Sequence, residues 1–466
     1  MKYLIRLITT GASLAVLGSC TSGLPFHSTT VPLRQTIHFA GTTVSPQILD
    51  SANDDVETSI TLPSLENDAS LRECLVYASL MSPELKVAFH NWKASLSRIP
   101  QVTALADPKV SLGYFIEEIQ TRTGPMEQQL SLSQSFPWWG LLEAKGDVAK
   151  SVANSKWHEY ESVRLNIFQK VVKRWTAVVD LENEISVITD SFELLAQAER
   201  IARRSYEVNG TSHSRLVQLQ VELGKLEDKL SNLNNLRGPR IAALNATLAR
   251  NGKDAFNLPS SIHLNVASIT LEDAIQLVAK NPAINAHNAT IEQHQLAIKV
   301  AELDAKPKWT VGLTYTNLGD PLDPTTPDAG NDPIMGMIGF SIPLNQTKTD
   351  AAKSEAMSKK LAAIAAKEAL LHELNAAIAE AIYQRDDSMR SITFYETALI
   401  PRAEDALGAV LVAFSTGTTS AIELLDSQRT LLELQRNLQR SYVAALNADA
   451  TISKLVGGAV KTELSQ

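Results

Sequence analysis

A stretch from Asp147 to Asn209 contains neither glycine nor proline, and it constrains the fold more than any other feature of the sequence. Apolar residues recur along it at steps of three and four positions, which places them on one side of a helix rather than on one face of a strand. These positions are Phe168, Val171, Trp175, Val178, Ile185, Ile188, Phe192 and Leu195. One continuous helix of this size would be about 90–100 Å long. Such a rod cannot bury its apolar stripe in an ordinary globular core, so we expect it to pack against other long helices.

The first residues have the pattern of a bacterial secretion signal. A short basic start is followed by an apolar stretch that is too short to span a bilayer, and this stretch ends in Leu-Gly-Ser-Cys at residues 17–20. The ending resembles the lipobox at which lipoproteins are cleaved. We therefore interpret residues 1–19 as a lipoprotein signal peptide and Cys20 as the acylated first residue of the mature chain, with palmitate as one expected acyl group. The alternative is an ordinary signal with a chance cysteine. The residue after Cys20 is Thr21 rather than an aspartate, which fits sorting to the outer membrane.

Charge and composition narrow the class of partner. Cleavage would remove Lys2 and Arg6, which changes the formal net charge from −8 to −10. An acidic chain with scattered basic residues argues against nucleic acid as a partner. Residues 20–69 are rich in serine, threonine and proline, and we expect them to form an extended, lipid-anchored N-terminal segment. If Cys20 carries lipid, Cys74 is the one remaining thiol, so no intramolecular disulfide is expected.

The remaining chain repeats one pattern twice. Residues 85–113 align with residues 284–312 at a constant offset, and each copy contains, in order, a helix, two strands, a very long helix and a shorter helix. Cys74 aligns with Ala274, which favours plain packing over thiol chemistry for this cysteine. We expect repeat 1 at 70–253 with a β-hairpin at 109–136, a linker at 254–269, repeat 2 at 270–458 with a β-hairpin at 309–342, and a tail at 459–466.

The four expected strands alternate between apolar and small polar residues. This alternation over strands of about ten residues is the pattern of a membrane barrel strand, although a soluble hairpin packed on a core is the alternative for any one pair. No apolar run of about eighteen residues follows the signal, so we expect any further membrane crossing to be made by strands. The apolar positions are Val110, Leu112, Tyr114, Ile116, Leu130, Leu132, Phe136, Trp309, Val311, Leu313, Tyr315, Ile338, Phe340 and Ile342.

Four prolines mark the ends of these strands. Pro108 and Pro307 precede the first strand of each pair, and Pro137 and Pro343 follow the second. Because proline cannot donate to a β-ladder and breaks a helix, these positions are expected to be helix–barrel junctions, all at one level.

The strands also predict assembly. Four strands cannot close a barrel, and an open sheet edge in lipid leaves unpaired backbone groups that cost several kcal/mol each. Small closed barrels have at least about eight strands. The chain is therefore expected to combine its hairpins with copies of itself. Two or three copies would both satisfy this requirement.

The second long helix is expected at residues 347–415, and it is rich in alanine, which favours helix and close approach of neighbouring rods. Pro401 lies inside it. We expect this proline to interrupt the helix and to kink it.

The chain resembles TolC-family outer-membrane efflux proteins over about residues 70 to 458. The resemblance lies in the duplicated helix–hairpin–long helix unit, in Leu-Ile-Pro at 399–401, and in Ala-Phe-Ser-Thr-Gly at 413–417 followed by Leu-Leu-Asp-Ser-Gln at 424–428. Residues 132–140, Leu-Ser-Gln-Ser-Phe-Pro-Trp-Trp-Gly, further resemble the branch associated with heavy-metal and cation efflux.

The resemblance implies a mainly α fold with a small β part. Two tandem repeats per chain would assemble into a homotrimer with a 12-stranded β-barrel in the outer membrane and an α-helical barrel in the periplasm. It also implies a periplasmic adaptor protein and an inner-membrane pump, often of the RND type, as partners. The chain would be the passive exit duct for metal cations or drugs. The adaptor-docking helix turns would be at Asn209, Gly210, Thr416 and Gly417.

Acidic residues follow the second of these turns. Members of the family place acidic groups around the periplasmic entrance, and Glu423 and Asp426 occupy such positions here. Three residues apart on a helix, they are expected to face the same side. A ring of these carboxylates would favour cations; a polar outer face after the turn is the alternative. Repeat 1 has Arg215 and Gln218 instead. Where relatives can hold the gate shut through an arginine, this chain has Thr419.

No pattern supports catalysis. The histidines are scattered, and neither a phosphate-binding loop nor a nucleophile elbow is present, so we expect no enzyme activity, no cofactor and no metal site. The competing class is a non-conducting, structural coiled-coil lipoprotein of the outer membrane.

Overall fold

The computed structural model describes residues 37–39, 42–44, 63–66, 69–209, 213–258, 269–325 and 327–458. By its contacts the chain divides into two compact units, one made of residues 1–37 and 45–62 and the other of residues 38–44 and 63–466. The second unit holds the two repeats, and it is described below. The signal peptide, Cys20 and most of the 20–69 segment lie outside the described residues.

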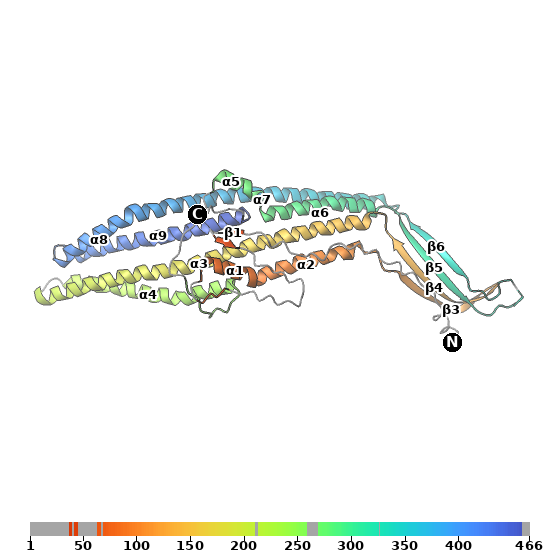
Figure 1. Ribbon diagram of the computed structural model, residues 1–466, viewed down its shortest axis with the longest axis horizontal. Helices are drawn as coiled ribbons and strands as arrows, with labels where there is room; N and C mark the ends of the chain where they lie inside the picture. Colours follow the sequence, from red (N-terminus) through yellow and green to blue (C-terminus); the bar gives the residue numbers. More distant parts are fainter. Residues whose placement is uncertain are drawn as a thin grey trace. The chain divides into compact units, whose positions relative to one another are not determined.

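The two repeats have the same order of elements (Figure 1). The mainly α fold with a small β part, predicted from the sequence, is therefore confirmed. The first repeat contains α1 (Leu71–Met81), α2 (Pro83–Thr103), β3 (Lys109–Thr121), β4 (Gly124–Phe136), α3 (Leu141–Asn209) and α4 (His213–Thr247). The second contains α5 (Leu271–Val278), α6 (Pro282–Asp304), β5 (Lys308–Leu318), β6 (Ile334–Ser341), α7 (Gln346–Phe394), the π-helical turn η1 (Tyr395–Leu399), α8 (Ile400–Ser415) and α9 (Ala421–Leu455). Two short strands, β1 (Ile37–Phe39) and β2 (Thr42–Val44), precede them.

Each repeat begins with a capped short helix. The hydroxyl oxygen of Ser70 accepts a hydrogen bond from the amide of Glu73 at 3.3 Å, and the hydroxyl oxygen of Thr270 accepts one from the amide of Asp273 at 3.2 Å. These caps satisfy amides that the first turn of a helix leaves without a partner. Cys74 is fully buried, and burial raises the pKa of its thiol to about 12. It therefore packs as a small apolar residue.

The longest helix, α3, has 69 residues and begins earlier than its glycine-free stretch. Gly146 lies inside it, where a Cβ atom would come within 2.7 Å of the Thr103 methyl group of α2. The glycine therefore lets the two helices approach closely instead of ending the helix. At about 1.5 Å per residue, α3 is roughly 100 Å long.

The second long helix is interrupted, as predicted, next to Pro401. Proline lacks an amide hydrogen, and its ring clashes with the carbonyl four residues earlier. The chain accommodates this with η1, whose wider turn separates α7 from α8 immediately before the proline. The corresponding part of α3 is continuous.

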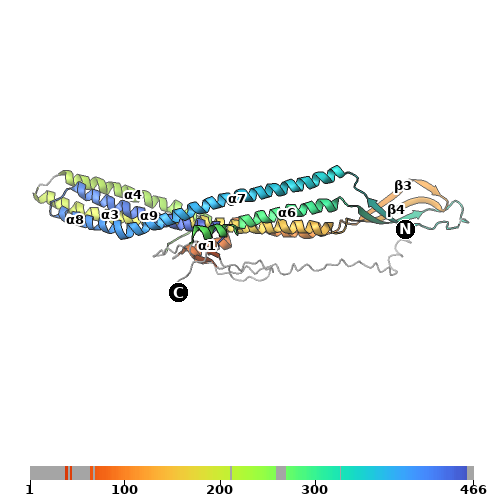
Figure 2. The same cartoon turned by 90° about the horizontal axis from the view of Figure 1, so that it is seen from above.

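The long helices pack against one another along their lengths (Figures 1 and 2). Helix α3 contacts α2, α4, α6 and α9, while α7 contacts α6 and α9. At the end remote from the four-stranded sheet, apolar residues of both repeats form one core cluster, which includes Ile188, Leu195, Leu219, Phe414 and Leu424. None of the described helices combines the length and apolarity needed to cross a membrane.

Strands β3, β4, β5 and β6 form one antiparallel sheet in that order. Its apolar face is open in the single chain: Val110 is 68% exposed and Ile116 is 93% exposed. The opposite face carries small polar residues in register, among them the pair Ser131 and Thr314, whose hydroxyl oxygens lie 3.1 Å apart. Among the described strands, β3 and β6 pair on one side only. The sheet therefore exposes both an apolar face and two unpaired edges.

The helix–strand junctions lie at one end of this sheet. Pro108, Pro137, Pro307 and Pro343 are all in the short connections between a helix and a strand. The register pairs the strand ends next to them, Phe136 with Trp309, for example. The connecting loops lie at the other end, where the amide of Gly319 donates to the carbonyl of Pro125 at 2.8 Å.

Candidate functional site

The two helix turns lie together at the end remote from the sheet (Figures 1 and 2). Asn209 is the last residue of α3, and Gly210 lies outside the described residues. In the second turn, Thr416 and Gly417 end α8, and the amide of Thr418 donates to the carbonyl of Ala413 at 2.9 Å. Gly417 has a φ of +83°, a left-handed conformation that glycine adopts without strain.

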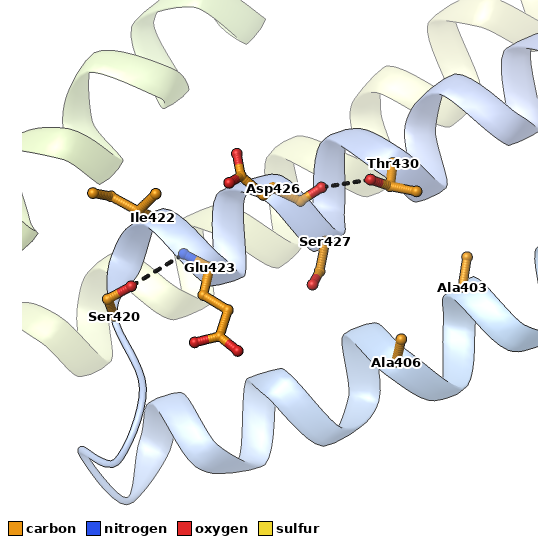
Figure 3. Close-up of a pocket in the computed structure, with 8 residues that line it drawn as sticks. All are labelled: Ala403, Ala406, Ser420, Ile422, Glu423, Asp426, Ser427 and Thr430. Atoms are coloured by element: carbon orange, nitrogen blue, oxygen red, sulfur yellow. Dashed lines mark hydrogen bonds between the residues drawn. The ribbon is translucent and has the colours of Figure 1, made fainter.

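The two carboxylates named from the sequence follow this turn on α9. Both line a pocket of about 370 Å³ between α8 and α9, together with Ala403, Ala406, Ser420, Ile422, Ser427 and Thr430. In Figure 3, Glu423 extends toward α8, whereas Asp426 points away from it. Spacing by three residues therefore brings both to one pocket but leaves their carboxylates divergent within one chain.

Local contacts hold these two acids. The hydroxyl of Ser420 caps α9 by accepting a hydrogen bond from the amide of Glu423 at 3.2 Å (Figure 3). The hydroxyl of Thr419 donates to the Glu423 carboxylate. Asp426 lies 3.8 Å from the guanidinium of Arg429, and its side chain is largely exposed. None of the residues that line the pocket is basic, so the arrangement suits weak attraction of cations.

Arg215 of repeat 1 joins the second turn, a contact that sequence reasoning missed. Its guanidinium donates to the carbonyl of Thr419 at 2.7 Å and to that of Phe414 at 3.2 Å, and it lies 4.0 Å from the centre of the Phe414 ring. Desolvation lowers the pKa of Arg215. A basic residue in the first turn of a helix is unfavourable, because it lies beside the positive end of the helix dipole. The position of Arg215 in the sequence therefore indicated that it has a stabilising partner elsewhere.

A second contact between the repeats involves Glu222 of α4. Its carboxylate accepts hydrogen bonds from Arg429 of α9 at 2.6 and 3.2 Å and from Lys225 at 3.2 Å. The hydrogen bond from Arg429 is the largest cause of the lowered pKa of Glu222. Together with Arg215, this pair ties the helical hairpin of repeat 1 to that of repeat 2 within one chain.

Metal-ligating side chains do not form a cluster in the part of the chain that the structure describes. No group of three or more histidine, cysteine, aspartate or glutamate residues there could hold a metal ion.

Comparison with known proteins agrees with this architecture. The family model described as "Outer membrane efflux protein" matches residues 275–458, which lie in the second repeat. The cobalt-zinc-cadmium resistance protein CzcC of Cupriavidus metallidurans is 22% identical over 426 residues, covering 87% of this chain and 95% of CzcC.

Solved structures share the fold over most of the chain. The outer membrane protein VceC of Vibrio cholerae gives a TM-score of 0.69 at 19% identity, over 86% of this chain and all of VceC. CusC, a protein described as forming a transmembrane channel, gives a TM-score of 0.72 at 13% identity, over 85% of this chain and 94% of CusC. The chain is thus similar to outer membrane efflux proteins over its second repeat, to CzcC over most of its length, and to the solved structures in fold.

Proposed function

We propose that this chain is the outer-membrane exit duct of a tripartite efflux system, through which substrates pass passively. The observation that carries the proposal is the four-stranded sheet, with its exposed apolar face and two unpaired edges, continuing directly into very long helices. In lipid, the unpaired edge groups would cost several kcal/mol each, so the sheet must be completed before it can cross a membrane.

Sister chains are the natural source of the missing strands. Two chains would give eight strands and three would give twelve, and both numbers suffice for a closed barrel of about eight strands or more. The family and its shared fold favour three, hence a homotrimer with a 12-stranded barrel and an α-helical barrel. The apolar face of the sheet would then meet lipid, and the face with Ser131 and Thr314 would line the bore.

The helix turns at the remote end are the proposed contact with a periplasmic adaptor protein. Asn209 and Gly210 in repeat 1, and Thr416 and Gly417 in repeat 2, would meet the adaptor. An inner-membrane pump of the RND type would deliver the substrate. The substrates are metal cations or drugs. The name of CzcC, a cobalt-zinc-cadmium resistance protein, supports metal cations.

The proposed location is the outer membrane, with the helices projecting into the periplasm. Cys20, lipidated after removal of residues 1–19, would add a second anchor in the same membrane. The proline junctions at Pro108, Pro137, Pro307 and Pro343 would mark the level at which the β-barrel passes into the helical barrel.

At the entrance, Glu423 and Asp426 are the proposed acidic ring. Three chains would place several carboxylates around a narrow mouth, where they attract cations and repel one another. Replacing both with their amides should weaken block by divalent cations in planar-bilayer recordings. Unchanged block would remove these residues from the entrance.

Planar-bilayer recording also tests the main proposal. Detergent-extracted protein should give discrete conductance steps, because a closed bore inserts as one unit. Protein that is correctly folded and oligomeric but gives no steps would favour the alternative, a non-conducting structural coiled-coil lipoprotein.

A further inference from the structure

An aromatic pocket lies where the sheet meets the helices, far from the helix turns. It has a volume of about 450 Å³, within the range of about 300–1,000 Å³ that small-molecule sites occupy. Strands β4 and β5 and the start of α3 form its walls. Leu105, Phe136, Trp138, Trp139, Trp309 and Val311 supply most of its apolar lining.

The tryptophans of this pocket form a right-angled cluster. The rings of Trp138 and Trp139 are 5.1 Å apart at 77°, and those of Trp139 and Trp309 are 4.6 Å apart at 78°. Trp139 nevertheless remains 63% exposed. Tryptophan is favoured where an apolar ring can contact lipid while its N–H stays near water, as at the interfacial zone of a bilayer.

The pocket is continuous with the apolar face of the sheet. Phe136 and Trp309 face each other across β4 and β5, and Val311 follows on the same face of β5. These are the two inner strands, whereas sister chains would join at the outer edges of β3 and β6. Assembly through those edges therefore leaves the pocket open toward lipid.

The charge of the lining selects among lipids. Glu143 is the one ionisable side chain among the residues that line this pocket. Its carboxylate repels an anionic headgroup. A headgroup ammonium, in contrast, can approach both this carboxylate and the face of a tryptophan ring. The favoured ligand thus has an acyl chain and a zwitterionic, ammonium-bearing head.

We propose that the pocket formed around Trp138, Trp139 and Trp309 binds one zwitterionic phospholipid per chain, at the periplasmic interface of the outer membrane. The acyl chain lies along Leu105 and Val311, and the headgroup ammonium lies beside Glu143 and Trp139. The site fixes the depth of the barrel in the membrane at the junction. This inference depends on the proposed function, because it requires the apolar face of the sheet to meet lipid.

Native mass spectrometry of the delipidated oligomer tests the proposal. Titration with phosphatidylethanolamine should add one tightly held lipid per chain, with at least tenfold preference over phosphatidylglycerol. Trp139→Ala should weaken this binding at least tenfold. The matched control is Trp92→Ala, a tryptophan of the α2–α3 aromatic cluster outside the pocket, which should bind as wild type does. Equal binding by the two variants, or preference for phosphatidylglycerol, overturns the proposal.

Two further variants keep the test decisive if the alanine variant is misfolded. Trp139→Phe should reduce quenching of tryptophan fluorescence by phosphatidylethanolamine brominated on its acyl chain, and Glu143→Gln should reduce the preference over phosphatidylglycerol at least threefold. No change in either measurement counts against the site. Conductance recorded on the same samples separates the two claims: steps without lipid selectivity refute this inference alone, whereas the absence of steps refutes the proposed function.

Discussion

Removal of the Arg215 guanidinium should loosen the second helix turn. Arg215→Met keeps most of the apolar stem but deletes the hydrogen bonds to the carbonyls of Thr419 and Phe414 and the contact with the Phe414 ring. A hydrogen bond from a charged group contributes about 1.5–3 kcal/mol, and a cation–π contact about 0.5–2 kcal/mol. Because the guanidinium is partly exposed, the lower values apply. The shorter hydrogen bond, to Thr419, and the ring contact then give about 2 kcal/mol, and the longer bond to Phe414 is left out of this sum.

A loss of about 2 kcal/mol corresponds to a population of opened turns about 30-fold larger. Hydrogen–deuterium exchange of the assembled protein measures this directly at the amides of residues 413–419, one of which, Thr418, is bonded to Ala413 at 2.9 Å. Exchange there should accelerate by about the same factor, since local opening limits it. Arg215→Lys should show a smaller acceleration, because lysine keeps the charge but not the planar fork.

Arg237→Met is the matched control. Arg237 lies further along the same helix and is bonded to Glu182 at 2.6 and 2.7 Å, so its loss removes an exposed ion pair that does not reach the turn. Exchange at residues 413–419 should match the wild type in this variant. Equal protection of the turn in Arg215→Met and wild type would refute the conclusion that Arg215 holds the second helix turn in place.

Three further predictions concern the folded chain. Because hydrogen bonds lower the pKa of Glu222, its contribution to the free energy of unfolding is complete above the ordinary glutamate pKa of about 4.3 and is lost as the pH falls below it, so Glu222→Gln should flatten the decline of melting temperature in acid. Leu219→Ala, at a fully buried position, should lower the free energy of unfolding by about 2–5 kcal/mol in denaturant titration, whereas Val217→Ala, at an exposed position of the same helix, should cost about 0.5 kcal/mol or less. Gly124 has a φ of +142°, and a Cβ atom there would lie 2.4 Å from a carbonyl oxygen of the facing loop, so Gly124→Ala should reduce the yield of assembled oligomer on size exclusion. Gly330 has a φ of +72° but open space around it, so Gly330→Ala should reduce this yield far less.

The spacing of apolar residues predicted the architecture because it depends only on the local structure of each helix or strand. The alternation of apolar and polar residues located all four strands, and the prolines at their ends marked the junctions. The position of the helix start was harder to predict. From the sequence alone, Gly146 suggests a break in the helix, because glycine disfavours helix. In the structure its small size lets α3 approach Thr103, which is far away in the sequence. The π-helical turn before Pro401 was not predicted either, since only an interruption follows from the proline itself.

The candidate site was predicted in part. The sequence identified the turn at Gly417 and placed Glu423 and Asp426 near it, and both line one pocket. The direction of each carboxylate depends on the packing of α8 against α9, which residue spacing does not describe. Likewise, the contact between Arg215 and Phe414 joins residues that lie far apart in the sequence, and it arises only once the two repeats pack together.

Each chain is expected to supply only part of a barrel wall and to complete the wall with sister chains. Native mass spectrometry of the purified protein in mild detergent tests this most directly, because it weighs the assembly without assuming its structure. We predict a species of three times the chain mass, in which the edges of β3 and β6 are protected from hydrogen exchange. A folded monomer whose β3 and β6 amides exchange freely would show that the chain does not need sister chains to complete its sheet.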